Sequence, residues 1–298
     1  MYASATDISK LGRAILSSSL IKPALTRRWL NPVAFSSDEV ASVSSPWGLR
    51  RIQLDPVNQP HRTLTVYTKA GTFRRYTAFI TLLKDFNLGF TIMMAGNPPL
   101  NNFYGADLLG QSLIPAYDAV ARDEADRLFS GTYAARSAGS GGNSSITIST
   151  TAGKPGLGIS SWTSNGTNML DMSLMLQAGT AFLPQKAEAR LYYTLLEGKA
   201  PGGGTRQSFK AVFEDTGPPG VGRQLWSTDC GAWVGVTGVT YGSMPLDEFI
   251  FERDSSGKVV SVENLALRTK YYKTTQTMNS AGWAWDGNRW KDSVRRKK

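Results

Sequence analysis

The chain has 298 residues, a formal net charge of +10 and an apolar fraction of 41%, enough to bury the core of one large or two ordinary domains. A single cysteine excludes an intrachain disulfide, and one cysteine with one histidine excludes a Cys/His zinc cluster. No run of about 18 apolar residues predicts a membrane-spanning helix, and the first residues do not have the pattern of a signal peptide. The compartment stays open.

The first part of the chain predicts helices followed by strands. Ser4 and Asp7 are typical of a helix start, and the apolar residues after them recur at helical spacing. A second short helix is predicted over 22–30, because Pro23 is tolerated in a first turn. Four strands bounded by turn residues follow, over 47–54, 62–69, 76–83 and 88–95.

A long helix with an apolar stripe is predicted over 101–129, and the pattern then changes. A Gly/Ser-rich stretch over 137–145 is typical of a loop. Short strands are predicted at 145–149, 158–163, 169–176, 188–196, 207–213, 232–239, 248–253 and 259–267. This spacing indicates an antiparallel barrel or sandwich. The fold class predicted for the whole chain is therefore α+β.

Residues 273–298 form a basic tail, with seven Lys or Arg side chains against two acidic ones. Three tryptophans, Trp283, Trp285 and Trp290, lie among these charges, and such a mixture can bind nucleic acid or an anionic membrane surface. The rest of the chain is only mildly basic and favours no nucleic-acid fold. We therefore predict a disordered tail and no nucleic-acid partner.

Several short sequences, in this order, resemble one enzyme family. Residues 1–16 resemble a helix with the pattern Ser-x-x-Asp-[Leu/Ile]-x-x-[Leu/Phe]-Gly, and Tyr67-Thr-Lys-Ala-Gly71 resembles the active-site motif Lys-Thr-Gly. Residues 88–96 resemble the next strands, while 161–166 and 246–251 resemble an extra C-terminal barrel. Together they resemble the C-terminal part of a fungal serine β-lactamase-like protein, related to class C β-lactamases and penicillin-binding DD-peptidases. Some of these proteins belong to secondary-metabolite pathways.

The resemblance implies a division of the chain into three parts. Residues 1–130 would be the C-terminal half of a β-lactamase/transpeptidase-like domain, with an antiparallel sheet and helices. Residues 131–272 would form the antiparallel β-barrel or sandwich, and 273–298 the tail.

The resemblance also implies acyl transfer through a serine, on a small ester, thioester or amide substrate, without a metal or organic cofactor. Lys69 would position the substrate, and the backbone N–H of Thr72 would form half of the oxyanion hole. Ala70 and Gly71 would lie against the substrate. Ala70 departs from the motif, because it removes a hydroxyl that hydrogen-bonds a bound carboxylate. The alternative interpretation of residues 69–71 is a strand end with a turn glycine.

The serine and lysine of the first motif have no convincing counterpart. Ser19–Lys22 and Ser255–Lys258 fit Ser-x-x-Lys as strings, but one lies between helices and the other in a turn. We therefore expect a truncated, inactive homologue. It would need a missing N-terminal half or would self-associate, because a half domain exposes strand edges.

The remaining candidates have simpler interpretations. His61 is expected in a solvated loop rather than as a base, and Cys230 as a small buried residue. Six aromatic residues could fill a barrel core or line a ligand cavity; they are Trp162, Trp226, Trp233, Phe213, Phe249 and Phe251. A ligand cavity would favour a second hypothesis, a non-catalytic protein that binds a ligand or docks on a partner through the barrel.

Overall fold

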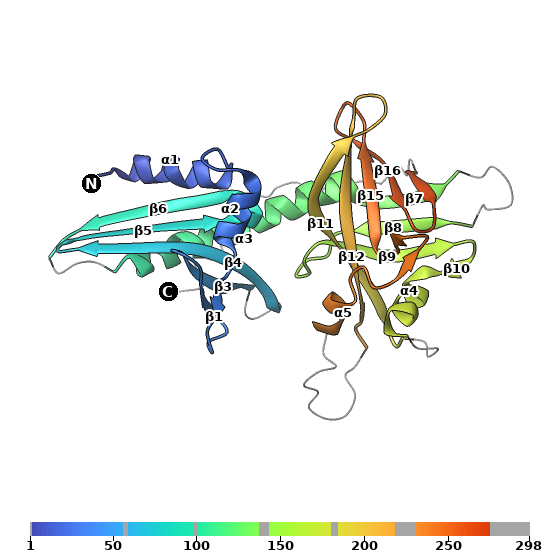
Figure 1. The fold of residues 1–298 in the computed structure, drawn as a ribbon, viewed down its shortest axis with the longest axis horizontal. Helices are drawn as coiled ribbons and strands as arrows, with labels where there is room; N and C mark the ends of the chain where they lie inside the picture. The colour runs from blue at the N-terminus through green and yellow to red at the C-terminus, as the bar shows by residue number, and fades with distance from the viewer. Residues whose placement is uncertain are drawn as a thin grey trace, which may run out of the picture.

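The computed structural model describes residues 2–55, 59–97, 101–136, 143–179, 184–217 and 230–274. A six-stranded sheet and a nine-stranded sheet lie at opposite ends of a long helix, α3 (Asn102–Phe129) (Figure 1). Neighbouring strands in both sheets are antiparallel. The predicted α+β fold class is confirmed.

The first sheet follows the order of the chain. Its elements are α1 (Ala5–Leu16), α2 (Pro23–Leu30), β1 (Ala34–Phe35), β2 (Ala41–Val43), β3 (Gly48–Asp55), β4 (Gln59–Phe73), β5 (Tyr76–Leu83), the 3-10 helix η1 (Lys84–Phe86) and β6 (Leu88–Ala95). The strand order is β1-β2-β3-β4-β5-β6. The strands predicted from the sequence between residues 47 and 95 are therefore direct neighbours.

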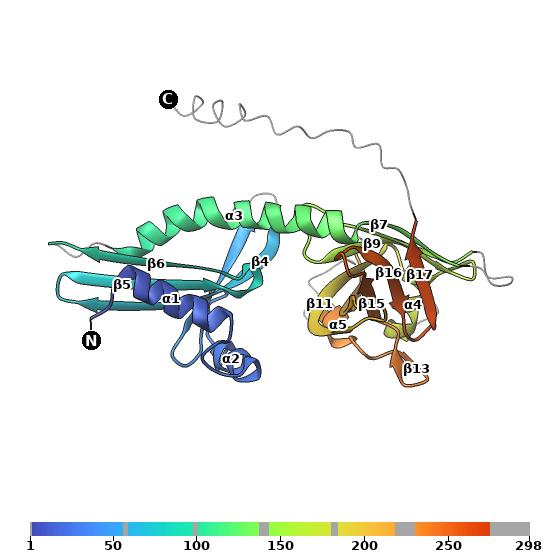
Figure 2. The ribbon, with the colours of Figure 1, turned by 90° about the horizontal axis from the view of Figure 1, so that it is seen from above.

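Period-two alternation buries both faces of this sheet. Leu64 and Val66 of β4 pack with Ile114 of α3, whereas Ile80 and Leu82 of β5 pack with α1 and α2. Figure 2 shows α3 along one face and α1 and α2 along the other. Gly12 lets α1 approach closely, because a Cβ there would lie 3.2 Å from a methyl carbon of Leu82.

The second sheet closes on itself. Its strands are β7 (Gly131–Ala135), β8 (Ser145–Ser149), β9 (Leu157–Ser164), β10 (Thr167–Asn168), β11 (Ala187–Lys199), β12 (Thr205–Asp215), β15 (Glu248–Arg253), β16 (Val259–Asn264) and β17 (Thr269–Lys273). Their order is β10-β9-β11-β12-β15-β16-β17-β7-β8, and β8 also pairs with β9. We call this assembly the closed sheet. The helices α4 (Met169–Ala178) and α5 (Cys230–Val234) and the hairpin β13 (Thr240–Tyr241) and β14 (Met244–Pro245) accompany it.

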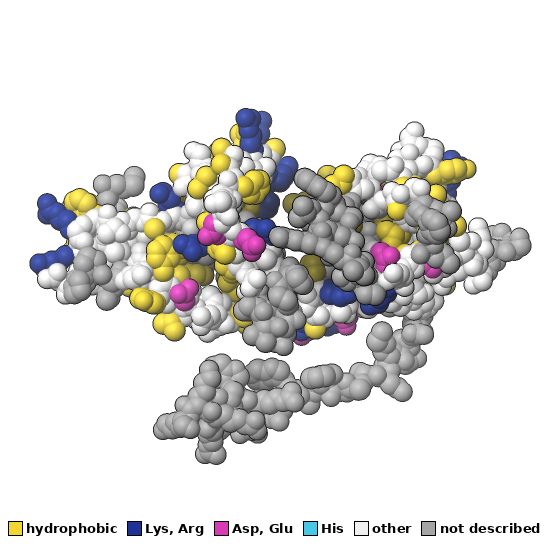
Figure 3. Space-filling model, turned by 90° about the horizontal axis from the view of Figure 1, so that it is seen from below, with side chains coloured by type: hydrophobic (Ala, Val, Ile, Leu, Met, Phe, Trp, Pro, Cys, Tyr) yellow, Lys and Arg dark blue, Asp and Glu magenta, His cyan; other side chains and the backbone are white. Residues whose placement is uncertain are grey.

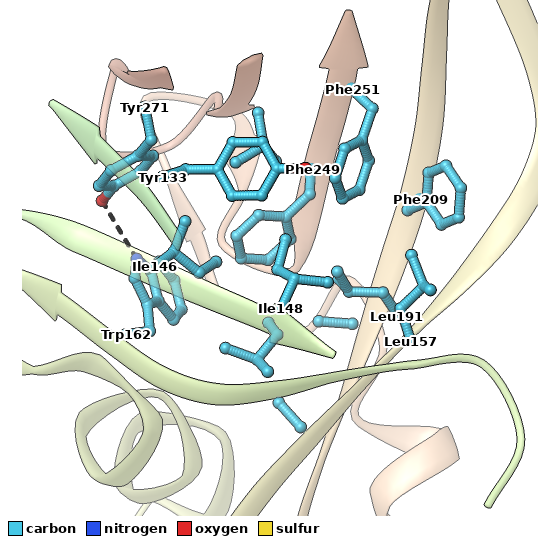
Figure 4. Packing of buried hydrophobic residues seen from close by; sticks show 14 of the residues in the cluster. Tyr133, Ile146, Ile148, Leu157, Trp162, Leu191, Phe209, Phe249, Phe251 and Tyr271 are labelled. Atoms are coloured by element: carbon cyan, nitrogen blue, oxygen red, sulfur yellow. Dashed lines mark hydrogen bonds between the residues drawn. The ribbon is translucent and has the colours of Figure 1, made fainter. Parts of the chain in front are cut away.

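Aromatic side chains fill the closed sheet (Figure 4). The Trp162 ring lies 5.1 Å from that of Phe249 and 6.3 Å from that of Phe213, measured between centroids. The Trp162 indole N–H donates to the Tyr271 hydroxyl over 3.1 Å. Between α4 and the adjoining strands, a cavity of only about 10 Å³ remains. The described aromatic core is therefore packed, and the cavity beside α4 is too small to hold a ligand.

Two strand predictions in this part are wrong. Residues 169–176 belong to helix α4, because Asn168 caps its start and Gly179 ends it with a left-handed φ of 63°. Residues 232–239 were expected as a strand, but they include the end of α5 and a turn. The strands β7 and β17 were not predicted, and β16 ends at Asn264, three residues before the predicted end.

Replacing Tyr271 by phenylalanine is expected to destabilise the closed sheet. Both partners of its hydrogen bond are buried, so Tyr271→Phe leaves the Trp162 N–H without an acceptor. The free energy of unfolding should fall by about 1–3 kcal/mol in urea denaturation followed by near-UV circular dichroism. Tyr241→Phe is the matched control, because Tyr241 is 69% exposed. Equal effects of the two substitutions would contradict this account of the core.

Candidate functional site

The end of β4 has a strand neighbour on one side only. β3 pairs with β4 as far as Thr68, which lies opposite Gly48. β5 continues to pair through Phe73, which lies opposite Tyr76. Among the described residues, the stretch from Lys69 to Phe73 therefore forms an open edge, and it contains all four site residues expected from the sequence.

The chain turns away from β4 at a defined point. Thr68 donates its hydroxyl to the Gly48 carbonyl over 2.9 Å, which closes the β3–β4 ladder. Trp47, the residue before Gly48, is buried and packs edge-on against Trp29 of α2, with 5.4 Å between ring centroids. The backbone N–H of Ser44 donates to the Trp47 carbonyl and closes the β2–β3 turn. This packing keeps β3 from extending beside Lys69.

The register decides which amides of β4 meet this edge. Phe73 and Tyr76 close a two-residue hairpin, so they form a hydrogen-bonded pair. Hydrogen-bonded and non-hydrogen-bonded pairs alternate along an antiparallel ladder. The N–H and C=O of Thr72, and likewise of Ala70, therefore point away from β5 and toward the open edge.

The side chains of the same stretch divide between the two faces of the sheet. Tyr67 packs against the cluster on the side of α1 and α2, and the alternation places Lys69 and Gly71 on that side. Ala70 and Thr72 lie on the side of α3. The side chain of Lys69 is exposed, and no hydrogen bond or ion pair joins it to the described residues. Its ammonium group is thus available to an anionic group at the edge.

Tyr67 is a polar neighbour to which the sequence interpretation assigned no role. It lies two residues before Lys69 on the same face and is half-buried. Burial raises the pKa of its hydroxyl, and the negative charge of Asp85 adds to the rise. The Tyr67 hydroxyl therefore loses its proton at a higher pH than an ordinary tyrosine does. Its period-two spacing from Lys69 was the only signal for this placement.

A partly buried ion pair joins the other end of β4 to α3. The two terminal guanidinium nitrogens of Arg62, Nη1 and Nη2, donate to the carboxylate of Asp118, and the Nη1 contact is 2.9 Å long. The two side chains are 15% and 12% exposed. Two-point contacts of this kind fix orientation as well as distance. The ion pair thus fixes the start of β4 relative to α3, the helix that covers it.

A groove of about 500 Å³ lies on the opposite face of the sheet, between β3–β5 and α3. Apolar side chains such as Phe79 and Ile114 line it, with Arg50 and Asp107 among its polar groups. The hydroxyl of Thr81 is buried there and has no hydrogen-bond partner among the described residues. Lys69 lies on the other face, whereas Ala70 and Thr72 lie on the same face as this groove, next to Thr68 and Phe79 of its lining.

Neither Ser-x-x-Lys string lies on a helix. Ser19 falls between α1 and α2, and its hydroxyl donates to the Ala14 carbonyl over 3.2 Å. Ser255 lies in the β15–β16 turn. The lysine amines with hydrogen-bond or ion-pair partners in the described chain bind carboxylates or, for Lys273, a backbone carbonyl. No serine–lysine pair lies beside β4 in the part of the chain that the structure describes.

Other predicted features lie outside the described residues. They are the side chains of His61 and Cys230, the residue Trp226, and the tail from residue 275 onward. The absence of a nucleic-acid partner for the tail therefore stays a prediction. Among the side chains that can be placed, no three His, Cys, Asp or Glu groups gather as metal ligands would. No described helix is both long enough and apolar enough to cross a bilayer.

Hydrogen exchange should reveal the alternation along β4. We expect the amides of Ala70 and Thr72 to exchange as exposed groups, because their N–H bonds face the open edge. The amides of Lys69, Gly71 and Phe73 should be protected, because they donate to β5. Residue-resolved exchange by NMR on the full chain measures both sets. Equal protection of all five amides would mean that another strand covers the edge.

Comparisons with known proteins agree with the resemblance seen in the sequence. A family model described as "Beta-lactamase-like-like, C-terminal domain" matches residues 121–275, more than half of the chain, from within α3 to the end of the closed sheet. A probable hydrolase, clz13, of Cochliobolus lunatus is 28% identical over 297 residues, covering 94% of this chain and 45% of that protein. A β-lactamase-like protein of Arthroderma benhamiae is 25% identical over 290 residues, covering 90% of this chain and 48% of that protein.

The chain spans about half the length of these relatives, including a probable hydrolase, M10, of a Phoma species, of which it covers 43% at 28% identity. A solved structure of an octameric penicillin-binding protein homologue from Pyrococcus abyssi matches 71% of this chain and 45% of that one, at 10% identity and a TM-score of 0.31. That value is too low to support an argument about fold or function. On the family model and the fungal relatives, the chain belongs to the β-lactamase-like family, whose C-terminal domain occupies residues 121–275.

Proposed function

We propose that these residues form the substrate-positioning side of a serine acyl hydrolase or acyltransferase site. Lys69 would hold an anionic group of the substrate, and the Thr72 N–H would donate to the developing oxyanion. The observation that carries the proposal is the open edge, where an outward amide and an unpaired ammonium group lie three residues apart on one strand. Membership of a family whose relatives are described as hydrolases supports the acyl chemistry.

The proposed reaction needs few groups from this chain. A serine oxygen would attack the carbonyl carbon of an ester, thioester or amide, and the carbonyl oxygen would become an oxyanion held by the Thr72 N–H. Collapse of this intermediate would break the bond to the leaving group, which departs with a proton. Water or a second acceptor would then release the acyl group from the serine.

Ala70 removes one hydrogen bond that the motif would otherwise make to a substrate carboxylate. A hydroxyl residue at this position of the motif would donate a hydrogen bond, and alanine cannot. Lys69 then provides the positive charge at the edge without a neighbouring hydroxyl from residue 70. We expect carboxylate-bearing substrates to be held more loosely here than at an unmodified Lys-Thr-Gly motif, by about 1 kcal/mol for one lost hydrogen bond.

The described residues do not provide the nucleophile for this reaction. Serine attack in this family needs a lysine one helical turn after the serine, close enough to take its proton. No such pair lies beside β4 in the described residues, so we expect the 298 residues alone to be inactive. Loss of a nucleophile removes most of the chemical rate and leaves binding and oxyanion effects. A segment bearing that serine would have to complete the site.

The outer edge of β6 is where we expect such a segment, or a second copy of the chain, to pair. β6 is the last strand of the first sheet, and its eight residues have β5 as their only strand neighbour among the described residues. Nearby, α3 exposes Tyr104 and Leu108, which are 72% and 73% accessible. Unpaired strand edges beside apolar surface promote association. Docking of the closed sheet on another protein also stays a prediction.

Activity should appear only in a completed site. The purified chain is expected to turn over neither a chromogenic β-lactam nor a nitrophenyl ester. Co-expression with the part of the Cochliobolus lunatus relative that this chain does not match should produce ester hydrolysis. Lys69→Met should then lower kcat/KM by about 100-fold, whereas Lys10→Met on the outer face of α1 should not.

Two results would count against this proposal. Turnover by the chain alone that survives both Ser19→Ala and Ser255→Ala would show that another nucleophile is present. Activity in the completed protein that is unchanged by Lys69→Met would remove the lysine from the site.

The chain alone should also self-associate. We expect light scattering to give a mass above that of the 32.4 kDa monomer. Lysines introduced at two exposed β6 positions, in the double variant Met93→Lys/Ala95→Lys, should shift the mass toward the monomer, because charges on an edge strand oppose pairing. The matched control is Val234→Lys/Tyr241→Lys, at exposed positions beside the closed sheet. A monomeric wild-type chain would refute the prediction.

A further inference from the structure

Three rows of side chains cross β4, β5 and β6 on the face that carries Lys69. The first row is Lys69, Ile80 and Thr91; the second is Gly71, Ala78 and Met93; the third is Phe73, Tyr76 and Ala95. Successive rows lie about 7 Å apart, because they are two residues apart along each strand. The rows thus place a lysine, a low apolar floor and an aromatic wall in that order.

The second and third rows are uncovered in the described structure. α1 reaches the first row, where a Cβ on Gly12 would lie 3.4 Å from Ile80. Beyond it, Met93 is 37% exposed, and Phe73 and Tyr76 are 70% and 65% exposed. A Cβ added to Gly71 would meet nothing within 4 Å. We call the surface of Gly71, Phe73, Tyr76, Ala78 and Met93 the aromatic shelf.

Positive side chains border the aromatic shelf on β4 and at the hairpin turn, whereas α1, which covers the adjoining row, carries Asp7 in its first turn. Lys69 borders it on one side, and Arg74 and Arg75 form the hairpin turn on the other. The Arg74 guanidinium lies over the Phe73 ring, 5.4 Å from its centroid. No Asp or Glu occurs in residues 69–80 or 88–97. Figure 3 shows Lys or Arg side chains with hydrophobic groups beside them at this far end of the first sheet, left in that view.

The aromatic shelf adjoins the proposed oxyanion amide. Thr72 lies between Gly71 and Phe73 in β4, so a carbonyl oxygen held by its N–H brings the attached acyl group beside the second and third rows. The floor of Gly71 and Ala78 leaves room for a flat group, and the rings of Phe73 and Tyr76 offer it edge or face contacts.

We propose that the aromatic shelf binds the acyl group of an anionic substrate, in which a flat apolar or aromatic acyl group carries a carboxylate. The apolar part lies over Gly71 and Ala78 against the two aromatic rings, and the carboxylate faces Lys69 or Arg74. This inference rests on the proposed function, and it names the substrate class of that site. Phe73 and Tyr76 are then specificity-determining residues rather than groups that take part in bond making.

Binding can be measured on the full chain without any turnover. The probes are naphthalene-2-carboxylate and its neutral carboxamide, followed by saturation-transfer NMR titration. The dissociation constant of the carboxylate should be lower than that of the carboxamide by a factor of about three or more. The double variant Phe73→Ala/Tyr76→Ala should weaken carboxylate binding about tenfold, since it removes two aromatic contacts. Gly71→Val should weaken it similarly by filling the floor.

The matched control is Phe35→Ala/Tyr241→Ala, which removes two exposed aromatic rings elsewhere and should leave binding unchanged. The inference is wrong if the Phe73/Tyr76 variant binds like the wild type, or if charge on the probe has no effect. A third result would also contradict it, namely that neither probe binds and that the wild-type chain sediments with phosphatidylcholine vesicles containing phosphatidylglycerol. In that case the Phe73/Tyr76 variant would not sediment with them. The last result would make the aromatic shelf a membrane contact. None of these outcomes depends on a serine, so the role of Lys69 is tested separately by activity in the completed protein.

Discussion

Beyond Thr68, β5 is the one strand that pairs with β4 among the described residues, and this pairing directs every second amide of β4 away from β5. In the proposed site, Lys69 and Thr72 would serve one substrate only because this edge is open. If β3 were longer by one hydrogen-bonded pair, its backbone would occupy the position at which a ligand would meet Ala70. The burial of Trp47 against α2, just before β3 begins at Gly48, is thus as necessary to the proposed site as the lysine itself.

The helix α3 connects this edge with the closed sheet. Near its middle, Ile114 packs in the core of the first sheet, and Asp118 holds Arg62 of β4. At its end, Phe129 belongs to the core of the closed sheet, with its ring 5.0 Å from that of Phe251. One helix therefore contributes to two cores. The packed interior of the closed sheet suits such a structural role.

The sequence predicted the motif of the candidate site, but it did not predict which residues of other strands surround that motif. The order Lys69, Ala70, Gly71 could be recognised from the sequence because it is local, but the predicted strand end with a turn glycine is wrong, because β4 continues to Phe73 and Gly71 pairs with Ala78. The sequence did not indicate that burial by α1, α2 and β5 raises the pKa of the Tyr67 hydroxyl. Nor did it indicate the aromatic shelf, because its rows join residues of three strands, and cross-strand partners depend on register rather than on spacing along the chain.

The amino-acid sequence by itself determined the four long strands of the first sheet but not the short strands β1 and β2, because turn residues separate the long stretches with a clear period of two. It failed where that period is weak. Residues 169–178 are apolar on most sides, so the caps at Asn168 and Gly179, rather than an amphipathic stripe, identify a helix. Only the tertiary structure decided that the second sheet closes through β8 and β9, and that β4 has a free edge. Both depend on hydrogen bonds between distant segments, and no local pattern encodes which strands become neighbours.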